Sequence, residues 1–385
     1  MDLKFFVFTT MIVLLMINLV FFFFLLIRKM FLIKIDEKNE IIYTNCENEV
    51  LNFLASGERS TFFDNMSKRE EKIFESVVFD YVKMLKNQKR KELIDLIGRD
   101  KILKTVTENL NKKNDWDKCL GAYQAGEFHI NEVEIELLEL LDSEDRETVY
   151  IAMDSLLKVG GAKYLRNLLN RCVSGKIVAK NNLLYIIDGI EEDIEHIMLE
   201  FIDSKSTFLR CVVLDVCGDR GYEGAIEWIL KGFKDSDMEV KIASLKAANK
   251  YKNFPYNSKE SDFYKLLDDE NWQVRLFFTK NLAKIDDVKS ISILKDCMGD
   301  LSWNVRNTAA NVLIEKGDEG ILALIDVIDS KDRYASDKAV EILQRELVQN
   351  DLRDNLHKKN PSLAKKIEDK IKEIIAEEVE KNDLD

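Results

Sequence analysis

The sequence contains very few prolines and histidines. Only 2 prolines occur among its 385 residues, so few positions force a helix to end. The 3 histidines, His129, His196 and His357, lie far apart in the chain, and none falls in a spacing typical of metal ligands. The sequence therefore favours long runs of helix, and it indicates neither a metal site nor a histidine-based catalytic centre.

Other signs of chemistry are also missing. The sequence has no glycine-rich phosphate loop, because Gly160 and Gly161 stand where a helix carboxyl end is expected. Its many carboxylates have the distribution of solvated side chains on exposed faces. The cysteines are scattered, and most fall on predicted helix faces, where a free thiol behaves as a small apolar residue: Cys46, Cys119, Cys172, Cys211, Cys217 and Cys297. We therefore expect no disulfide framework, no catalytic residues, no cofactor and no enzyme activity.

The charge of the chain is strongly negative and unevenly distributed. The formal net charge is −13, and residues 114–385 carry 38 basic and 54 acidic side chains. Such a surface repels the phosphate backbone of nucleic acids. This balance argues against a nucleic-acid partner.

A long uncharged segment stands near the amino end. Residues 5–27 contain no charged side chain, and as a helix they would extend about 34 Å at roughly 1.5 Å per residue. That length crosses the hydrocarbon core of a bilayer. A cleaved signal peptide is the alternative, but its apolar core would be shorter and no small-residue cleavage site follows Ile27. We therefore predict a transmembrane helix that contacts the lipid bilayer through residues 5–27.

The flanking cations predict the orientation of this helix. Lys4 lies on its amino side, whereas Arg28, Lys29, Lys34 and Lys38 follow it. Positive charge favours the cytoplasmic side of a membrane. We expect the amino terminus outside and residues 28–385 in the cytoplasm, attached to the cell membrane by a single span.

Two segments in the carboxyl-terminal half repeat one pattern. Residues 267–275 read LDDENWQVR and residues 299–306 read GDLSWNVR. In each segment an N-cap residue, Asn271 or Ser302, precedes Trp-x-Val-Arg and an apolar stripe at helical spacing. Steps of about 30 residues place Asp, Asn or Ser at every predicted cap: Asp115, Asp145, Ser174, Ser206, Asp237, Asn271, Ser302 and Asp332. A helical hairpin of this length cannot bury its apolar stripe alone, so its copies should stack into an α-solenoid.

The positions after each cap support this register. Seven residues after the cap, where packed helices require a small contact, stand Ala122, Ala152, Ser244, Ala309 and Ala339. The exceptions at this position are Asn181, Val213 and Phe278. Eleven residues after the cap, leucine completes the buried stripe at Leu156, Leu282, Leu313 and Leu343.

The pattern resembles the HEAT repeat in its short bacterial form, known as PBS-lyase-like HEAT. The resemblance spans residues 115–345 and is strongest over 237–343. Besides the Ala and Leu positions, it rests on Val-Arg at 274–275 and 305–306 and on an Asp before each turn: Asp142, Asp203, Asp235, Asp268, Asp300 and Asp329. It implies that the first helix of each pair lines the convex side of the solenoid and the second helix the concave side.

These observations predict an all-α chain in which one transmembrane helix precedes an α-solenoid of HEAT-like helical hairpins. Ser67 and Glu70 form a predicted capping box at the start of an amphipathic helix. Pro255 should interrupt the solenoid with a longer loop. The expected segments are a transmembrane anchor (1–33), a flexible juxtamembrane tether (34–66), an N-terminal helical cap (67–113), the repeat array (114–347) and a C-terminal capping helix (348–385).

Aromatic and basic side chains near the caps are the candidate partner-binding residues: Trp272, Trp303, Tyr334, Arg275 and Arg306. Half-buried indoles interleaved with arginines are typical of a protein-binding rim. The alternative is that the indoles pack against each other. For Arg275 and Arg306 the resemblance implies a structural role, in which such an arginine bridges to the turn aspartates Asp268 and Asp300 of adjacent repeats.

The most consistent interpretation is a non-catalytic, membrane-anchored scaffold that binds a protein partner at the inner face of the membrane. Its resemblance to anchored HEAT-repeat proteins of Gram-positive bacteria implies a membrane-associated client, for example an envelope or exopolysaccharide glycosyltransferase. The alternative is a lyase-like or cofactor-handling HEAT-repeat protein, since phycobilin lyases are built similarly. The absence of a clustered reactive site in the sequence argues against that alternative.

Overall fold

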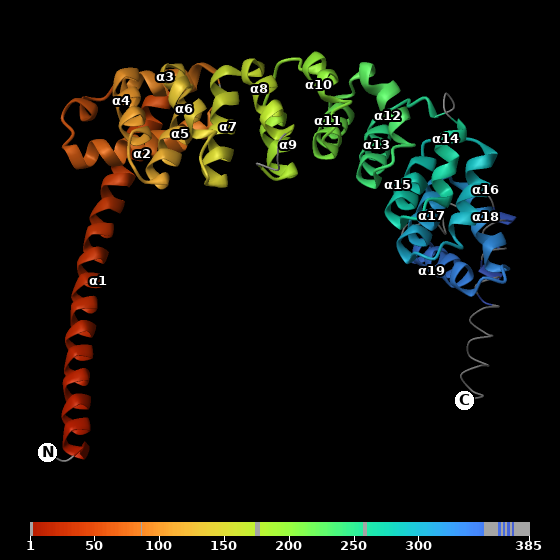
Figure 1. The fold of residues 1–385 in the computed structure, drawn as a ribbon, viewed down its shortest axis with the longest axis horizontal. Coiled ribbons are helices and arrows are strands. Elements are labelled where there is room, and N and C mark those ends of the chain that lie inside the picture. The colour runs from red at the N-terminus through yellow and green to blue at the C-terminus, as the bar shows by residue number, and fades with distance from the viewer. Residues whose placement is uncertain are drawn as a thin grey trace. The chain divides into compact units, whose positions relative to one another are not determined.

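The structure, a computed structural model, describes residues 3–85, 87–173, 178–256 and 260–349 and a few positions between 361 and 372. Throughout these residues the regular elements are helices, and no strand occurs among them. The predicted fold class is confirmed: one long apolar helix precedes a solenoid of helical hairpins (Figure 1). The chain divides into two compact units, Met1–Gly161 and Ala162–Asp385.

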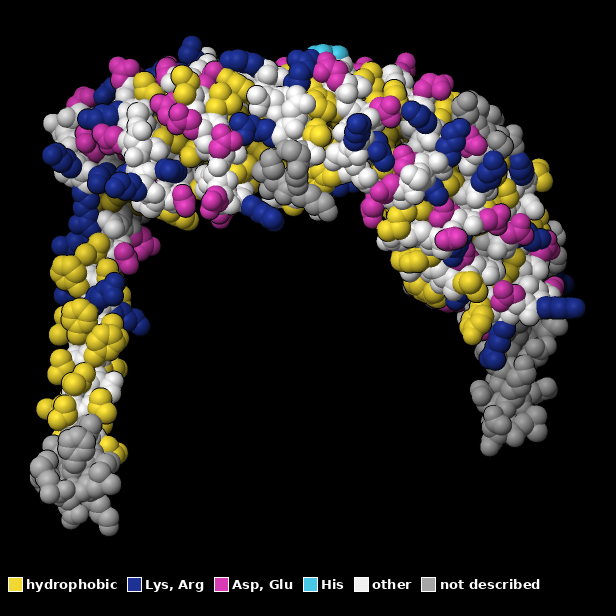
Figure 2. Space-filling model, in the orientation of Figure 1, with side chains coloured by type: hydrophobic (Ala, Val, Ile, Leu, Met, Phe, Trp, Pro, Cys, Tyr) yellow, Lys and Arg dark blue, Asp and Glu magenta, His cyan; other side chains and the backbone are white. Residues whose placement is uncertain are grey.

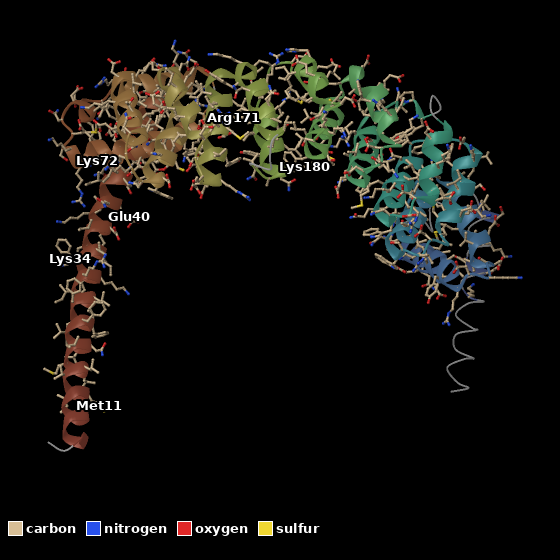
Figure 3. All side chains as sticks on the ribbon, viewed as in Figure 1. Met11, Lys34, Glu40, Lys72, Arg171 and Lys180 are labelled. Atoms are coloured by element: carbon tan, nitrogen blue, oxygen red, sulfur yellow. The ribbon has the colours of Figure 1, made fainter. Side chains whose placement is uncertain are left out.

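The first element, α1 (Leu3–Ser56), is a single helix of 54 residues. Its large apolar side chains from Met11 to Ile33 are exposed. Figure 3 labels Met11 within this apolar part and Lys34 and Glu40 in the charged part that follows it. Among the described residues, this is the helix that is long and apolar enough to cross a membrane.

The prediction of a flexible tether over residues 34–66 was wrong for its first two thirds. Residues 34–56 continue α1 without a break and pack against α2 (Lys68–Met84). Cys46 and Val50 are fully buried in this contact, since a spacing of four residues places them on one helix face. The Arg69 guanidinium also donates to the Ile35 carbonyl at 3.2 Å and to Asn39 Oδ1 at 2.8 Å. The helix ends before Gly57, which has a positive φ of 76°.

The remaining helices of the first unit follow in short hairpins. The predicted capping box at the start of α2 is present, because the Ser67 N–H donates to Glu70 Oε2 at 2.8 Å while Ser67 Oγ accepts from the Glu70 N–H. Two turns of 3₁₀ helix, η1 (Thr61–Asp64) and η2 (Asn131–Val133), join the larger elements. The α-helices after α2 are α3 (Asn87–Ile97), α4 (Arg99–Leu110), α5 (Asp115–Phe128), α6 (Glu134–Leu140) and α7 (Arg146–Gly160).

The second unit is a succession of helical hairpins. Neighbouring second helices pack side by side, as α11 does on α13 and α15 on α17, while first helices such as α16 and α18 contact each other. Its α-helices are α8 (Ala162–Val173), α9 (Lys180–Asp188), α10 (Glu195–Phe201), α11 (Thr207–Arg220), α12 (Ile226–Gly232), α13 (Met238–Lys250), α14 (Glu260–Tyr264), α15 (Trp272–Leu282), α16 (Val288–Cys297), α17 (Trp303–Glu315), α18 (Asp318–Ile328) and α19 (Arg333–Gln349). Its 3₁₀ turns include η3 (Glu223–Ala225) and η5 (Lys265–Asp268).

Most of the predicted caps begin a second helix of a hairpin. Asp145, Ser206, Asp237 and Asn271 each accept a hydrogen bond from a backbone N–H of the following turn. Asp332 Oδ1 accepts from the Tyr334 N–H at 3.0 Å in the same way. These side chains satisfy donors that the first turn of a helix leaves without a partner.

Three cap predictions need correction. The cap of α5 is Asn114, one residue before Asp115, because its amide oxygen accepts from the Asp117 N–H at 2.8 Å. Ser302 stands at the cap of α17, but its hydroxyl makes no capping hydrogen bond. Ser174 lies outside the described residues, and the next second helix, α9, begins at Lys180. Asn181 is consequently exposed, and the buried position seven residues after the cap Ala179 is Ile186.

The small residues expected at the helix contacts are buried. Ala122, Ala152, Ser244, Ala309 and Ala339 are all fully inaccessible to solvent. Second helices also approach closely at glycines: a Cβ added to Gly126 of α5 would lie 2.9 Å from Ser155 Cα of α7. In the second unit, a Cβ on Gly218 of α11 would lie 2.7 Å from Ala247 Cα of α13. Because backbone atoms line both approaches, any larger residue would push the two helices apart.

Two further predictions concern interruptions of the array. Pro255 lies in the connection between α13 and α14, as expected of the longer loop, although Asn257 lies outside the described residues. The predicted C-terminal capping helix over 348–385 also falls almost wholly outside them. The structure describes its first two residues, in α19, and a few positions between 361 and 372.

Candidate partner-binding surface

Three of the predicted site residues stand at the amino ends of successive second helices. Trp272 is the first residue of α15, Trp303 the first of α17, and Tyr334 the second of α19. Their exposed fractions are 39%, 56% and 71%. We call these three residues the aromatic row. A side chain in the first turn projects beyond the packed body of the helix, which explains why large rings there reach solvent.

Cations connect the aromatic row from one repeat to the next. Lys338 Nζ of α19 lies 4.9 Å from the ring centroid of Trp303 on α17. Arg306 Cζ, also on α17, lies 5.2 Å from the ring centroid of Tyr334. Both distances suit a cation–π attraction. Within the described residues no ring contact joins Trp272 to Trp303, so the two indoles do not pack against each other.

Arg275 is held within the solenoid. Its guanidinium donates to both carboxylate oxygens of Asp300 in the following repeat, from Nε at 2.6 Å and from Nη2 at 3.0 Å. Its Nη1 donates to the carbonyls of Asp269 at 2.7 Å and Glu270 at 3.1 Å. A paired geometry of this kind is the strongest that arginine makes with a carboxylate. The guanidinium of Arg275 therefore stabilises the junction between two repeats.

The ion pair of Arg275 has equivalents in the two preceding repeats. Arg210 Nη2 lies 3.3 Å from Asp235 Oδ1, and Lys241 Nζ lies 2.6 Å from Asp269 Oδ2. In each case the cation stands four residues after a cap and the carboxylate two residues before the next cap. The sequence prediction assigned this role to Asp268, but Asp269 carries it, because Asp269 is the residue two positions before its cap, as Asp235 and Asp300 are before theirs.

The residue two positions before each cap also shapes its turn, which the sequence interpretation did not recognise. The backbone N–H of the cap donates to this side chain: Asp237 to Asp235 at 2.9 Å, Asn271 to Asp269 at 2.9 Å and Ser302 to Asp300 at 2.7 Å. Serine takes the position elsewhere, as in the bond from the Asp332 N–H to Ser330 Oγ at 3.1 Å. The recurring Asp or Ser two residues before the cap was a usable signal.

These contacts change the acidity of Asp300. Burial by itself raises the pKa of its carboxyl, but the hydrogen bonds from Arg275 and from the Ser302 N–H outweigh burial and hold the pKa below its ordinary value. The carboxylate therefore stays ionised in the folded chain. One side chain thus forms the turn before α17 and the bridge to α15.

The hydrogen bonds of Arg306 go to backbone carbonyls, whereas Arg275 also binds a carboxylate. Its Nη1 donates to the carbonyls of Asp300 at 2.7 Å and Leu301 at 3.2 Å. The rest of its guanidinium faces the ring of Tyr334. Arg306 therefore belongs to the surface of the aromatic row, whereas Arg275 lies beneath it.

Two exposed apolar residues extend the aromatic row and were missed from the sequence. Met238 is the first residue of α13, and Leu301 lies in the turn before α17; both are exposed. Their signal was available, since Met238 occupies the slot of Trp272 and Trp303 in its own repeat. Figure 2 shows hydrophobic side chains gathered along the margin of the second unit over α15, α17 and α19.

The metal-ligand and thiol side chains among the described residues were also compared with the sequence expectations. No group of three or more His, Cys, Asp or Glu side chains among them is placed to hold a metal ion. All six cysteines are free thiols, and burial raises the pKa of Cys217 and Cys297 to about 12. Thiols this weakly acidic are poor nucleophiles at neutral pH. The Nδ1–H of His129 donates to the Lys158 carbonyl at 2.7 Å, and burial lowers the pKa of His129.

Comparison with known proteins identifies the repeats at the carboxyl end. The family described as HEAT repeats matches residues 260–359. This match contains the helices α15, α17 and α19, on which the aromatic row stands. No match was found among curated proteins.

The matches among solved structures are of low similarity. An engineered protein is 16% identical to this chain, with 85% of this chain and 99% of that chain covered and a TM-score of 0.40. Kap121p is 11% identical, with 79% of this chain and 45% of Kap121p covered and a TM-score of 0.41. Human deoxyhypusine hydroxylase, solved in complex with glycerol, is 10% identical, with 79% of this chain and 96% of the hydroxylase covered and a TM-score of 0.26. Since these scores are low, the fold rests on the helix pairing and on the family match. Residues 260–359 therefore match HEAT repeats, and the helical hairpins of the described residues form an α-solenoid.

Proposed function

We propose that this chain is a non-catalytic scaffold that is anchored in the cell membrane by α1 and binds a protein partner with its HEAT-repeat solenoid. Repeats of this kind suggest protein interaction as their general role. The observation that carries the proposal is the aromatic row: two indoles in the same slot of successive repeats, both reaching solvent. Tryptophan, tyrosine and arginine are the residues that most often dominate binding energy at interfaces.

The anchor is supported by α1. A soluble protein gains nothing from exposing a continuous apolar helix surface, and exposed apolar area of this extent indicates contact with lipid or another protein. The apolar segment from Met11 to Ile33 is uniformly exposed, and Arg28, Lys29, Lys34 and Lys38 lie at its carboxyl side. The positive-inside rule then places the repeats in the cytoplasm.

The partner surface in this proposal consists of Trp272, Trp303, Tyr334 and Arg306, extended by Met238 and Leu301. Arg275 contributes by fixing the junction of α15 with the next turn rather than by contact. Because the scaffold stands at the membrane, its client is a protein at the inner face of the membrane, for example an envelope or exopolysaccharide glycosyltransferase.

The proposal is tested by crosslinking the chain to its neighbours in intact membranes and identifying what is captured. The double variant Trp272→Ala, Trp303→Ala should remain folded and membrane-inserted but lose the captured protein, because interface aromatics typically cost about 2 kcal/mol or more when truncated. Trp228→Ala, on α12 and outside the aromatic row, is the matched control and should retain the partner.

Two results would contradict the proposal. Undiminished capture by the double variant would show that the partner binds elsewhere on the solenoid. If circular dichroism shows that the double variant is unfolded, the indoles support the fold and are not a partner surface.

A further inference from the structure

A second surface, on the first unit, has the features of a binding site. An open hollow of about 440 Å³ lies between α5 and α7. Its apolar lining comes from Leu120 and Tyr123 of α5 and Ile151 of α7. We call it the α5–α7 groove. Its volume lies within the range of about 300 to 1,000 Å³ that is usual for ligand pockets.

Trp116 forms one wall of this groove and is 80% exposed. It is the second residue of α5, and no ring contact among the described residues involves it. An indole contributes a large apolar area together with one N–H donor. Leaving such a side chain in water beside an apolar hollow gives no benefit to the folded chain alone, and it is typical of a surface that a partner covers.

The rim of the groove is acidic. Its charged lining residues are Asp115, Asp145 and Glu147, and no cation lines it. Helix amino ends ordinarily attract anions, but here carboxylates occupy both of them, so the local field favours cations. The surroundings have the same sign, because residues 114–161 carry 12 acidic and 3 basic side chains.

Two of the three rim carboxylates are available for a partner. Asp145 Oδ2 already accepts from the Thr148 N–H at 2.8 Å and from Thr148 Oγ1 at 2.7 Å. By contrast, Asp115 and Glu147 make no ion pair with any described residue. Two cations lie near the Tyr123 ring, Lys83 Nζ at 5.5 Å and Lys158 Nζ at 5.8 Å from its centroid, and both are paired with carboxylates. Lys83 Nζ lies 3.2 Å from Asp80 Oδ1, and Lys158 Nζ lies 2.7 Å from carboxylate oxygens of both Glu127 and Asp154.

We propose that the α5–α7 groove binds a basic protein segment in which an apolar or aromatic side chain is flanked by lysine or arginine. The apolar side chain fills the hollow over Leu120, Tyr123 and Ile151. The flanking cations pair with Asp115 and Glu147, and one of them stacks on the Trp116 ring. This site is separate from the proposed function of the aromatic row, since its residues all belong to the first unit.

The test uses the full chain in phosphatidylcholine nanodiscs and a fluorescein-labelled peptide, Lys-Arg-Leu-Lys-Trp-Leu-Arg-Lys. Fluorescence anisotropy measures binding, with empty nanodiscs subtracted. We expect the peptide to bind, and its counterpart with glutamate at each basic position to bind at least tenfold more weakly. Trp116→Ala and Glu147→Lys should each weaken binding of the basic peptide about tenfold.

Matched controls locate the site. Tyr185→Ala removes another exposed aromatic side chain, from α9, and Glu139→Lys reverses an exposed charge on α6; both should bind the peptide as the unaltered chain does. The Trp272→Ala, Trp303→Ala variant should also bind normally, which separates this inference from the proposed function. Because Cys119 lines the groove and the other five cysteines are buried, the bound peptide should slow alkylation of Cys119 by iodoacetamide.

Several outcomes would overturn the inference. Equal binding of the basic and acidic peptides would show an apolar surface without charge selection. Normal peptide binding by both Trp116→Ala and Glu147→Lys would show that the peptide binds elsewhere. Loss of peptide binding in the Trp272→Ala, Trp303→Ala variant would show the same. Failure of the basic peptide to bind the unaltered chain would reject the site. Glu147 is exposed, so its substitution reports on binding even where Trp116→Ala affects folding.

Discussion

At the scale of single residues, Asp300 shows how one carboxylate serves two repeats. It accepts the cap N–H of Ser302 in its own turn and both donors of Arg275 from the preceding second helix. Charge-assisted bonds of this kind are worth more than neutral ones, and most when they are partly buried. The junction between α15 and α17 therefore depends on a side chain that belongs to neither helix.

Substitution of Asp300 by asparagine should destabilise the chain in a pH-dependent way. A carboxyl whose pKa is lower in the folded chain stabilises the fold above the unfolded pKa, near 3.9, and loses this contribution as the pH falls through the folded value. Near neutral pH, Asp300→Asn should lower the free energy of unfolding by about 3 kcal/mol, since it leaves Arg275 without its carboxylate. The difference from the unaltered chain should shrink below about pH 4.

Urea unfolding of the detergent-solubilised chain at neutral and acid pH measures this effect. Asp326→Asn is the control, because Asp326 pairs with Lys295 at the surface at 3.3 Å and such pairs contribute at most about 1 kcal/mol. An equal loss for Asp300→Asn at both pH values would show that its charge does not matter.

At the scale of elements, α1 is the least expected feature. Its apolar half and its polar half form one helix, and the polar half packs on α2 through a stripe that includes Cys46 and Val50. Across this contact the Tyr43 hydroxyl donates to Asp80 Oδ2 at 3.3 Å, and the Tyr81 hydroxyl donates to Glu47 Oε1 at 3.0 Å. The apolar segment is therefore joined to the first unit by packed helix and not by a loose linker.

A buried charge at position 50 should separate α1 from α2. Val50 is 0% exposed, whereas its neighbour Leu51 is 45% exposed. Val50→Asp places an unpaired carboxylate in the contact and should cost about 3 kcal/mol locally, so trypsin should cleave at Lys38 and Arg59 much faster. Leu51→Asp is the matched control and should digest like the unaltered chain. Equal digestion of both variants would show that residues 34–56 behave as a tether after all.

At the scale of the whole molecule, the charge on either side of the apolar segment should determine topology. Arg28, Lys29, Lys34 and Lys38 follow the segment, whereas Lys4 alone among the basic side chains precedes it, so the repeats should stay on the cytoplasmic side. Protease added to intact protoplasts that express the chain should leave residues 67–385 undigested, and detergent permeabilisation should expose them. Immunoblotting with an antibody against the carboxyl end detects whether the repeats remain intact. Digestion from outside before permeabilisation would reverse the proposed topology and move the scaffold to the cell exterior.

What the sequence by itself determined is what depends on neighbouring residues. Helix caps such as Asp145 and Asn271 act on the next turn, and the period of apolar residues sets which face of a helix is buried, so both were predictable from the chain alone. The repeat at Trp272 and Trp303 then followed from comparing the sequence with itself, and it placed these two indoles of the candidate surface in one slot.

Only the tertiary structure decided how residues about 30 positions apart meet. Asp269, not Asp268, pairs with Lys241 of the preceding second helix, and the sequence pattern could not choose between these two adjacent aspartates. Residues 34–56 pack on α2, which buries Val50. Trp116 is exposed beside the α5–α7 groove because no described residue of the first unit covers it. Local propensity cannot anticipate these outcomes, since the free energy that decides them comes from packing between elements distant in the sequence.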